Sequence, residues 1–342
     1  MIARETLKRW LKFLVALAVS VVFSVLFLLS IDLGKAASAL ADANYLYVVP
    51  ALGLFAISLV FRSLRWQYFY GPERGLDWRV LLSPLLIGYA GNNLLPLRAG
   101  ELLRAQILAE RRGVPRMVTF GTLMMERLFD GFILAAFLVW GLLLAGTGGA
   151  YLGAGLLLAA LALVGFAAGT LLAHNPRLPA RLVSRPLPFV PDRLRDEVAS
   201  LSESFLGGFT VLTSFSRFGL AASTSAAAWG LELLMYWVIS RAFSLDASFI
   251  TIAFAGSAAN VAMSIPSAQG GVGPFQVLAL QALLQFGVAR SAAAAYAVAL
   301  HIFLVGPVSL VGLFLLWHST APAAAPAAAA PVLAPTSVEP TE

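Results

Sequence analysis

Residues 91–101 read Gly-Asn-Asn-Leu-Leu-Pro-Leu-Arg-Ala-Gly-Glu and interrupt an apolar region that covers residues 79–110. Asn, Pro and Gly are poor helix formers, so a helix is expected to break here. A break inside a membrane leaves backbone groups unpaired, which is tolerated only where protein or a wet cavity surrounds them. The stretch therefore predicts a broken or re-entrant helical hairpin.

A second apolar region, residues 247–287, is interrupted in the same way at residues 260–271, Asn-Val-Ala-Met-Ser-Ile-Pro-Ser-Ala-Gln-Gly-Gly. In both copies Asn precedes Pro, and Gly follows that Pro by four residues. A Gly-Val dipeptide follows in both copies, and Arg127 and His301 each lie fourteen residues after the glycine of that dipeptide. We expect two repeats, about 45–146 and 218–317. The alternative is two loops that lie shallow at the membrane interfaces.

The composition indicates a protein solvated largely by lipid. Of the 342 residues, 60% are hydrophobic and 12% are charged, whereas soluble domains carry about 25% charged residues. This excludes a soluble enzyme or a nucleic-acid-binding module, despite a net charge of +6. The chain has no cysteine and three scattered histidines, so we expect no disulfide, no metal site and no cofactor.

Apolar stretches of spanning length predict about six transmembrane helices, at residues 11–31, 45–62, 117–146, 150–173, 218–243 and 291–317. Together with the two broken hairpins, they define an all-α polytopic membrane protein. Arg62, Arg65 and Trp66 follow the second of these stretches and are expected to anchor it at the membrane interface.

The distribution of basic residues predicts the orientation. If the N-terminus is cytoplasmic, only Lys35, Arg241 and Arg290 fall outside, and Arg127 falls within a span. The two hairpins then enter from opposite sides, as inverted repeats do in many transporters. Both termini are expected to be cytoplasmic.

Two further segments complete the expected organisation. Residues 174–217 form a polar linker whose part 193–213 has helical apolar spacing, which predicts an amphipathic helix at the cytoplasmic interface. A linker helix packed on the bundle is the alternative. Residues 319–342 are rich in Ala and Pro and are expected to be a disordered tail after a membrane domain of residues 1–318.

Charged residues within the apolar regions are functional candidates, because each is unfavourable in lipid unless it is paired or hydrated. A guanidinium matches phosphate geometry and stays charged in a dry site. We assign phosphate binding to Arg98, Arg104 and Arg127, and neutral hydrogen bonds to Asn92, Asn93, Asn260 and Gln269. Orienting or coupling roles are assigned to Glu101, Glu126, Asp130, Glu232 and His301. The helix breaks are assigned to Pro96, Gly100, Pro266, Gly270, Gly271 and Gly273. The alternative is that these charges form a network that only holds the hairpin in place.

Three motifs resemble the transmembrane, flippase-like region of the lysylphosphatidylglycerol synthase family. They are Asn92-Asn93-Leu94-Leu95-Pro96-Leu97-Arg98-Ala99-Gly100-Glu101-Leu102-Leu103-Arg104, Glu126-Arg127-Leu128-Phe129-Asp130-Gly131 and Gly270-Gly271-Val272-Gly273-Pro274-Phe275-Gln276. The resemblance covers about residues 10–318. It implies a protein of a bacterial-type inner membrane that translocates lipid, without the aminoacyl-transferase domain of the family's full-length synthases.

Three functions are compatible with these features. The first is a flippase that moves an anionic or phosphate-bearing lipid between leaflets, with membrane lipids and a separate lipid-modifying enzyme as partners. The second is an intramembrane transferase that acts on a lipid carrier. The third is a non-catalytic scaffold for a lipid-modifying enzyme, which predicts tolerance of Arg98→Ala and Arg127→Ala.

Overall fold

The computed structural model describes residues 21–22, 24–29, 32–95, 98–145, 150–175, 192–263 and 269–320. Most of the predicted first span and residues 321–342 of the predicted tail lie outside these ranges, as do Pro96 and Pro266. Within the described ranges, all regular elements are helical. The chain is therefore an all-α protein, as the apolar pattern predicts.

Five long helices correspond to five of the predicted spans. They are α3 (Val48–Tyr70), α6 (Arg116–Ala145), α7 (Ala150–His174), α10 (Phe215–Ala242) and α13 (Arg290–Thr320). Among the described residues, three helices are long and apolar enough to cross a membrane, at Tyr45–Tyr70, Leu152–His174 and Arg290–His318. The main departure from prediction is α3, which continues beyond residue 62 to Tyr70.

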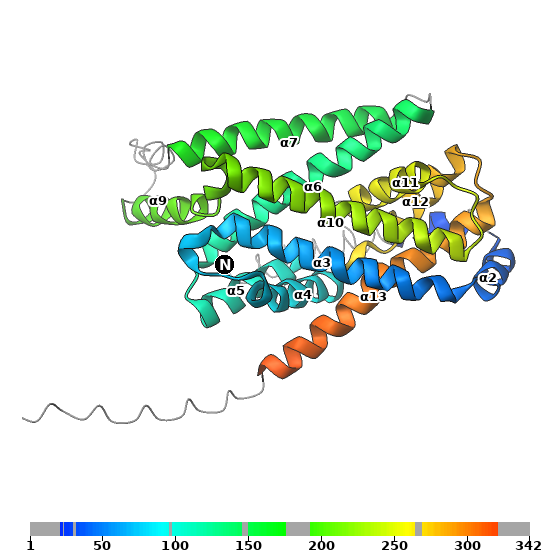
Figure 1. Cartoon of the computed structure of the whole chain (residues 1–342), viewed down its shortest axis with the longest axis horizontal. Helices are drawn as coiled ribbons and strands as arrows, with labels where there is room; N and C mark the ends of the chain where they lie inside the picture. Colours follow the sequence, from blue (N-terminus) through cyan, green and yellow to red (C-terminus); the bar gives the residue numbers. More distant parts are fainter. Residues whose placement is uncertain are drawn as a thin grey trace, which may run out of the picture.

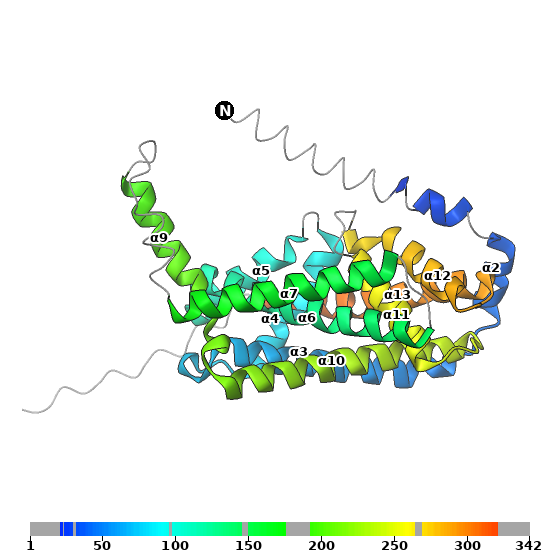
Figure 2. The ribbon, with the colours of Figure 1, turned by 90° about the horizontal axis from the view of Figure 1, so that it is seen from above.

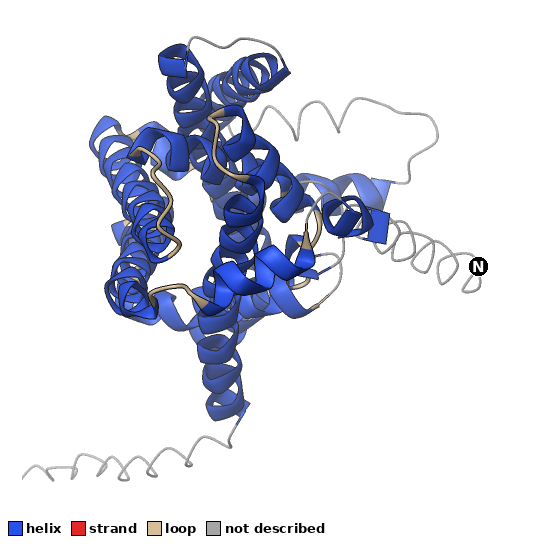
Figure 3. Ribbon diagram, turned by 90° about the vertical axis from the view of Figure 1, so that its right-hand side faces the viewer, coloured by secondary structure: helices blue, strands red, loops and turns tan. Residues whose placement is uncertain are grey.

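The long helices run roughly parallel to one axis of the molecule (Figure 1). Seen along that axis, most helices are viewed end-on (Figure 3). Short α2 (Leu33–Ala41) lies at one end of the bundle, and α9 (Asp192–Leu206) projects from the opposite end (Figure 2). The long axis is therefore the direction in which the bundle would cross a membrane.

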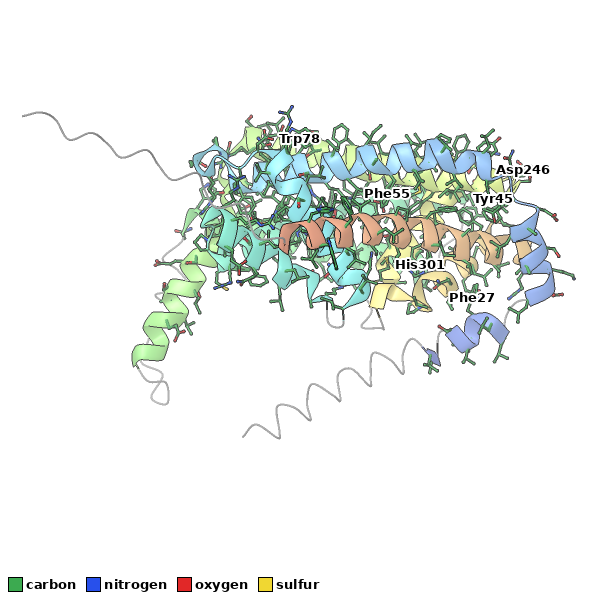
Figure 4. All side chains as sticks on the ribbon, turned by 90° about the horizontal axis from the view of Figure 1, so that it is seen from below. Phe27, Tyr45, Phe55, Trp78, Asp246 and His301 are labelled. Atoms are coloured by element: carbon green, nitrogen blue, oxygen red, sulfur yellow. The ribbon has the colours of Figure 1, made fainter. Side chains whose placement is uncertain are left out.

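Both interrupted regions form hairpins of two short helices. The first consists of α4 (Trp78–Leu94) and α5 (Gly100–Arg112), and the second of α11 (Phe249–Ala262) and α12 (Pro274–Gln285). They enter the bundle from opposite ends and turn near its middle (Figure 1). Trp78, which begins α4, and Asp246, which precedes α11, lie toward opposite ends, with His301 between them (Figure 4). The hairpins thus have the inverted arrangement that the sequence predicts.

The packing of the helices repeats in the same inverted order. The first helices of the two halves, α3 and α10, pack against each other along the bundle. Each hairpin's first helix packs on the last helix of the other half, α4 on α13 and α11 on α6. Helix α7 packs mainly on α6 and is not one of the helices that make these contacts between the two halves.

The linker differs from a single amphipathic helix over 193–213. Helix α9 ends at Leu206, and Gly207 and Gly208 follow it. A Cβ on Gly208 would lie 2.4 Å from the backbone N of Thr122 in α6, so the loop can approach α6 only without a side chain. Beyond the glycines, Phe209, Val211 and Leu212 are buried against the bundle. The last third of the predicted helix is thus a packed connection, whereas Val198 and Leu201 of α9 are each 43% exposed.

Candidate functional site at the meeting of two broken hairpins

The tips of the two hairpins meet. The Nη2 of Arg98 donates a 2.7 Å hydrogen bond to the backbone O of Met263, which lies at the end of α11. A Cβ placed on Gly270 would lie 3.6 Å from the backbone O of Asn93. Asn93 also donates a 3.1 Å hydrogen bond from Nδ2 to Ser309 Oγ of α13. The two breaks therefore converge on one site.

The backbone at both tips adopts conformations that are incompatible with a continuing helix. Gly270, Gly271 and Gly273 have φ values of 70°, 73° and 94°, which residues other than glycine rarely adopt. In the first hairpin it is Arg98, not a glycine, that has a positive φ, of 54°. This left-handed conformation is strained for a non-glycine residue and is typical of functional positions.

Behind the tips lies a network of buried ion pairs. Arg62 is 2.6 Å from Glu232, Arg65 is 2.6 Å from Asp130, and Arg104 is 3.0 Å from Glu126. Longer contacts join these pairs, from Arg62 to Asp130 at 3.8 Å and from Arg65 to Glu126 at 3.7 Å. Three arginines therefore face three carboxylates, and the network is neutral. It links α5 of the first hairpin to α6, as the sequence allows, and it also includes α3 and α10.

Aromatic and hydroxyl groups add further contacts to these charges, although Arg65 Nε, Arg65 Nη2 and Arg104 Nε are buried without a hydrogen-bond partner. Trp229 Nε1 donates to Asp130 at 2.7 Å, and Tyr236 OH donates to Glu232 at 2.7 Å. The guanidinium carbon of Arg62 lies 4.5 Å from the ring centroid of Trp229, and that of Arg104 lies 4.0 Å from Trp66. Cation–π contacts of this kind stabilise a guanidinium that has lost its water.

The prediction that Arg62, Arg65 and Trp66 anchor the helix at the interface is wrong. Their exposed fractions are 6%, 0% and 0%, because α3 continues for two turns beyond the predicted span and carries them into the bundle. Sequence reasoning therefore missed Arg62 and Arg65 as members of the network. The signal that could have found them is the aromatic run Trp66-Gln67-Tyr68-Phe69-Tyr70, which extends the apolar stretch past the charges.

Two predicted ligand groups are occupied by protein contacts. Arg104 is fully buried between Trp66 and Glu126, so in this conformation it cannot reach a ligand from the surface. Asn260 donates from Nδ2 to Tyr236 OH at 3.0 Å and to the backbone O of Gly256 at 2.9 Å. Glu232, to which an orienting or coupling role is assigned, pairs with Arg62.

Arg98 and Arg127 remain the accessible cations of the site. Arg98 is exposed, and the Arg127 side chain is 40% exposed. Arg127 lies 3.8 Å from Glu101, whose side chain is 28% exposed, and 3.6 Å from the buried Glu126. The two arginines are near enough to repel each other electrostatically. Because the buried network is neutral, this pair with the single Glu101 carries a local positive charge.

The glycine break of the second hairpin is held by polar contacts. His301 Nε2 is 2.8 Å from the backbone O of Gly270, and His301 Nδ1 is 2.5 Å from Gln276 Nε2. Gln276 Oε1 in turn accepts a 2.8 Å hydrogen bond from the backbone N of Gly273. The imidazole, 4% exposed, thus lies at the break, where the repeat pattern places it.

The structure describes some of the remaining predicted site residues and leaves others out. Gly100 begins α5, and a Cβ there would lie 1.9 Å from the backbone O of Gly88 in α4. The Asn92 Oδ1 is buried without a hydrogen-bond partner. Pro96, Pro266 and the side chain of Gln269 lie outside the described residues. In the part of the chain that the structure describes, no group of three or more His, Cys, Asp or Glu residues is arranged to hold a metal ion.

Broken hairpins that enter from opposite ends and meet beside buried charges define an all-α polytopic membrane protein with an inverted-repeat arrangement. The chain belongs to the family described as lysylphosphatidylglycerol synthase TM region, whose family model matches residues 13–312. The family that the three motifs resemble is thereby confirmed.

Two relatives show what the chain is similar to. The glycosyltransferase AglD of Haloferax volcanii is 26% identical over 314 residues, which cover 80% of this chain and 49% of that protein. A UPF0104 membrane protein of Methanothermobacter thermautotrophicus is 25% identical over 258 residues, covering 72% of this chain and 75% of that protein. The chain thus spans about half the length of the Haloferax relative. No solved structure matches the chain.

Proposed function

We propose that the protein is a flippase or transporter that moves an anionic, phosphate-bearing lipid between the leaflets of a membrane. The observation that carries this proposal is the pair of accessible arginines, Arg98 and Arg127, at the junction of two inverted breaks. The family and the transmembrane helices support a membrane protein concerned with lipids. Movement of the lipid is the step that we add.

The charge arrangement suits a lipid headgroup. Guanidinium groups offer fixed donors to phosphate oxygens, and hydrogen bonds to charged groups contribute about 1.5–3 kcal/mol each. Arg104, Arg62 and Arg65 are already neutralised by carboxylates, so Arg98 and Arg127 would supply the binding charge. In this proposal the headgroup passes along the hairpin tips while the acyl chains stay in the bilayer.

Leaflet exchange in reconstituted vesicles tests the proposal. The full chain is placed in phosphatidylcholine vesicles with fluorescent phosphatidylglycerol, and the loss of fluorescence to an impermeant external quencher is followed. We expect Arg98→Ala and Arg127→Ala each to slow protein-dependent exchange by about tenfold to hundredfold, the equivalent of one lost charged hydrogen bond.

Arg112→Ala is the matched control, because Arg112 is an exposed arginine at the far end of the same helix as Glu101. It should exchange lipid at the wild-type rate. Exchange that is equal with and without protein, for anionic, aminoacylated and polyprenyl lipids alike, would refute the proposal. Protein-dependent exchange at the wild-type rate by both Arg98→Ala and Arg127→Ala would show that these two arginines do not bind the headgroup.

An intramembrane transferase is the second candidate, favoured by the name of the Haloferax relative, a glycosyltransferase. In that case Glu126 or Asp130 would serve as an acid or base on a lipid carrier. Their pairing with Arg65 and Arg104 disfavours it, because a paired carboxylate is a weak base. Formation of a glycosylated lipid by the purified chain would establish this candidate.

A further inference from the structure

Three hydrogen bonds tie the glycine break to helices α12 and α13. They run from Gly270 O to His301 Nε2, from His301 Nδ1 to Gln276 Nε2, and from Gln276 Oε1 to Gly273 N. We call this set the His301 bridge. It connects the two ends of the break through two side chains.

The partners determine the protonation state of His301. The Gly273 N–H can only donate, so Gln276 must present its oxygen there and its amino group to the imidazole. Nδ1 therefore accepts, and Nε2 must carry the hydrogen that is donated to Gly270 O. The bridge requires a neutral imidazole in the Nε2–H form.

Protonation of His301 would place two donors against each other. With hydrogen on Nδ1, the ring would face the Gln276 amino group. If the Gln276 amide rotated, its amino group would instead face the Gly273 N–H. In either case one buried donor loses its acceptor, which is strongly unfavourable at a site only 4% exposed.

Charged neighbours do not offset this effect. The described contacts of His301 all go to uncharged groups, Gly270 O, the Gln276 amide and the Phe275 ring, whose centroid is 4.7 Å away. Helix α12 carries no titratable residue. The titratable residues on the other helices packed against α13 are Lys35 on α2, Arg79 and Tyr89 on α4, and Arg217, Glu232, Tyr236 and Arg241 on α10. Helix α13 itself adds Arg290, Tyr296 and His318.

His301 also occupies the position in its half that Arg127 occupies in the other. Each lies eleven residues after the first residue of its helix, Arg116 for α6 and Arg290 for α13. Each reaches the first turn of the hairpin helix that precedes it, Arg127 to Glu101 and His301 to Gln276. The first half therefore has an accessible charged pair, Arg127 with Glu101, and the second half has a neutral pair, the buried His301 with Gln276.

We propose that proton uptake by His301 releases the second break and so couples the opening of this half of the protein to pH. The proton passes from water to Nδ1, the hydrogen bond to Gln276 is lost, and the Gly270–Gly273 segment separates from α12 and α13. The consequence for lipid movement rests on the proposed function, whereas the opening itself does not.

The absence of cysteine from the chain allows a direct test of opening. A single cysteine replaces Ala262, the last residue of α11, which is 0% exposed beside the break. Its reaction with a polyethylene-glycol maleimide is measured on the detergent-solubilised full chain. The rate is divided by that of Lys35→Cys, a position whose side chain is 75% exposed, to remove the pH dependence of the thiol itself.

We expect this ratio to rise at least about fivefold from about pH 8 to about pH 5, the range in which histidine titrates. With His301→Gln, which can still donate to Gly270 O but does not titrate, the ratio should stay low at both values. With Gln276→Glu the dependence should reverse, because a carboxylate accepts from Gly273 N–H and from a protonated Nδ1, but repels the lone pair of a neutral one.

The same acid dependence in all three backgrounds, or none in the wild type, would overturn the proposal. Ala228→Cys, buried at 0% exposure on α10, is the control for unfolding. If it reacts in acid as fast as Ala262→Cys, the whole bundle loosens and the proposal also fails.

A parallel measurement of leaflet exchange at the two pH values separates this inference from the proposed function. If labelling follows His301 but no lipid exchanges at either pH, the bridge stands and the flippase proposal fails. If lipid exchanges, but neither the labelling ratio nor the exchange rate changes with His301→Gln or Gln276→Glu, the flippase proposal stands and the bridge fails.

Discussion

Glu126 is the central carboxylate of the buried network. It lies 3.0 Å from Arg104, 3.7 Å from Arg65 and 3.6 Å from Arg127, and it is 1% exposed. A buried charge is tolerated only when its counter-charges are in place, and removing one partner leaves the other uncompensated. The stability of this region therefore depends on Glu126 more than on any exposed member of the site.

We expect Glu126→Gln to lower the free energy of unfolding by about 3–5 kcal/mol, because Arg65 and Arg104 would stay buried without their counter-charge. Thermal unfolding of the detergent-solubilised protein, followed by the loss of its monodisperse chromatographic peak, measures the effect.

Glu101→Gln is the matched control. Its pair with Arg127 is partly solvated, so we expect a change below about 1 kcal/mol. Equal destabilisation by the two substitutions would contradict a special role for the buried carboxylate.

The first hairpin is narrow because glycines line its interior. A Cβ on Gly100 would lie 1.9 Å from Gly88 O and 2.5 Å from the backbone N of Asn92. A Cβ on Gly91 would lie 2.7 Å from the Cα of Gly100. Helices α4 and α5 are thus in backbone contact, and this contact holds Arg98 at the tip and Arg104 against Trp66.

Gly100→Ala should force α4 and α5 apart, since the obstructing atoms belong to the backbone and cannot rotate away. We expect a loss of about 1–3 kcal/mol of stability and a reduced rate of lipid exchange, both measurable on the reconstituted chain.

Gly53→Ala in α3 provides the comparison, because nothing lies within 4 Å of a Cβ built there. It should be neutral or slightly stabilising, as alanine favours helix more than glycine does. A stable, fully active Gly100→Ala protein would show that the hairpin does not need this close contact.

The two ends of the bundle differ in their number of Lys and Arg residues. Arg74, Arg79, Arg111, Arg112, Arg116 and Arg217 belong to segments at the end from which α9 projects. The opposite end has Lys35, Arg241 and Arg290. Because cytoplasmic loops retain an excess of Lys and Arg, the α9 end is expected to face the cytoplasm.

Single cysteines in the cysteine-free chain test this orientation. An impermeant maleimide added to intact spheroplasts should label Lys35→Cys at once, but should label Glu73→Cys only after permeabilisation, because Glu73 lies at the arginine-rich end. The reverse pattern would invert the assignment, and labelling of both positions from outside would exclude the two-ended topology.

Hydropathy and residue type were sufficient to predict the class of fold. The spans predicted at 117–146, 150–173, 218–243 and 291–317 agree closely with α6, α7, α10 and α13. They are predictable because lipid requires long apolar helices, whatever their neighbours. The breaks near Asn, Pro and Gly were predictable for a local reason too, since these residues are poor helix formers, although Asn92, Asn93 and Asn260 lie within α4 and α11.

The roles of the charged residues could not be predicted in this way. A sequence shows that Arg62, Arg65 and Arg104 are arginines near apolar segments, but not that they face Asp130, Glu232 and Glu126 from other helices. Which guanidinium is neutralised and which remains accessible depends on contacts between residues as far as 170 positions apart. Those contacts arise from the packing of α3 on α10 and of the hairpins on the opposite halves, which no local pattern encodes.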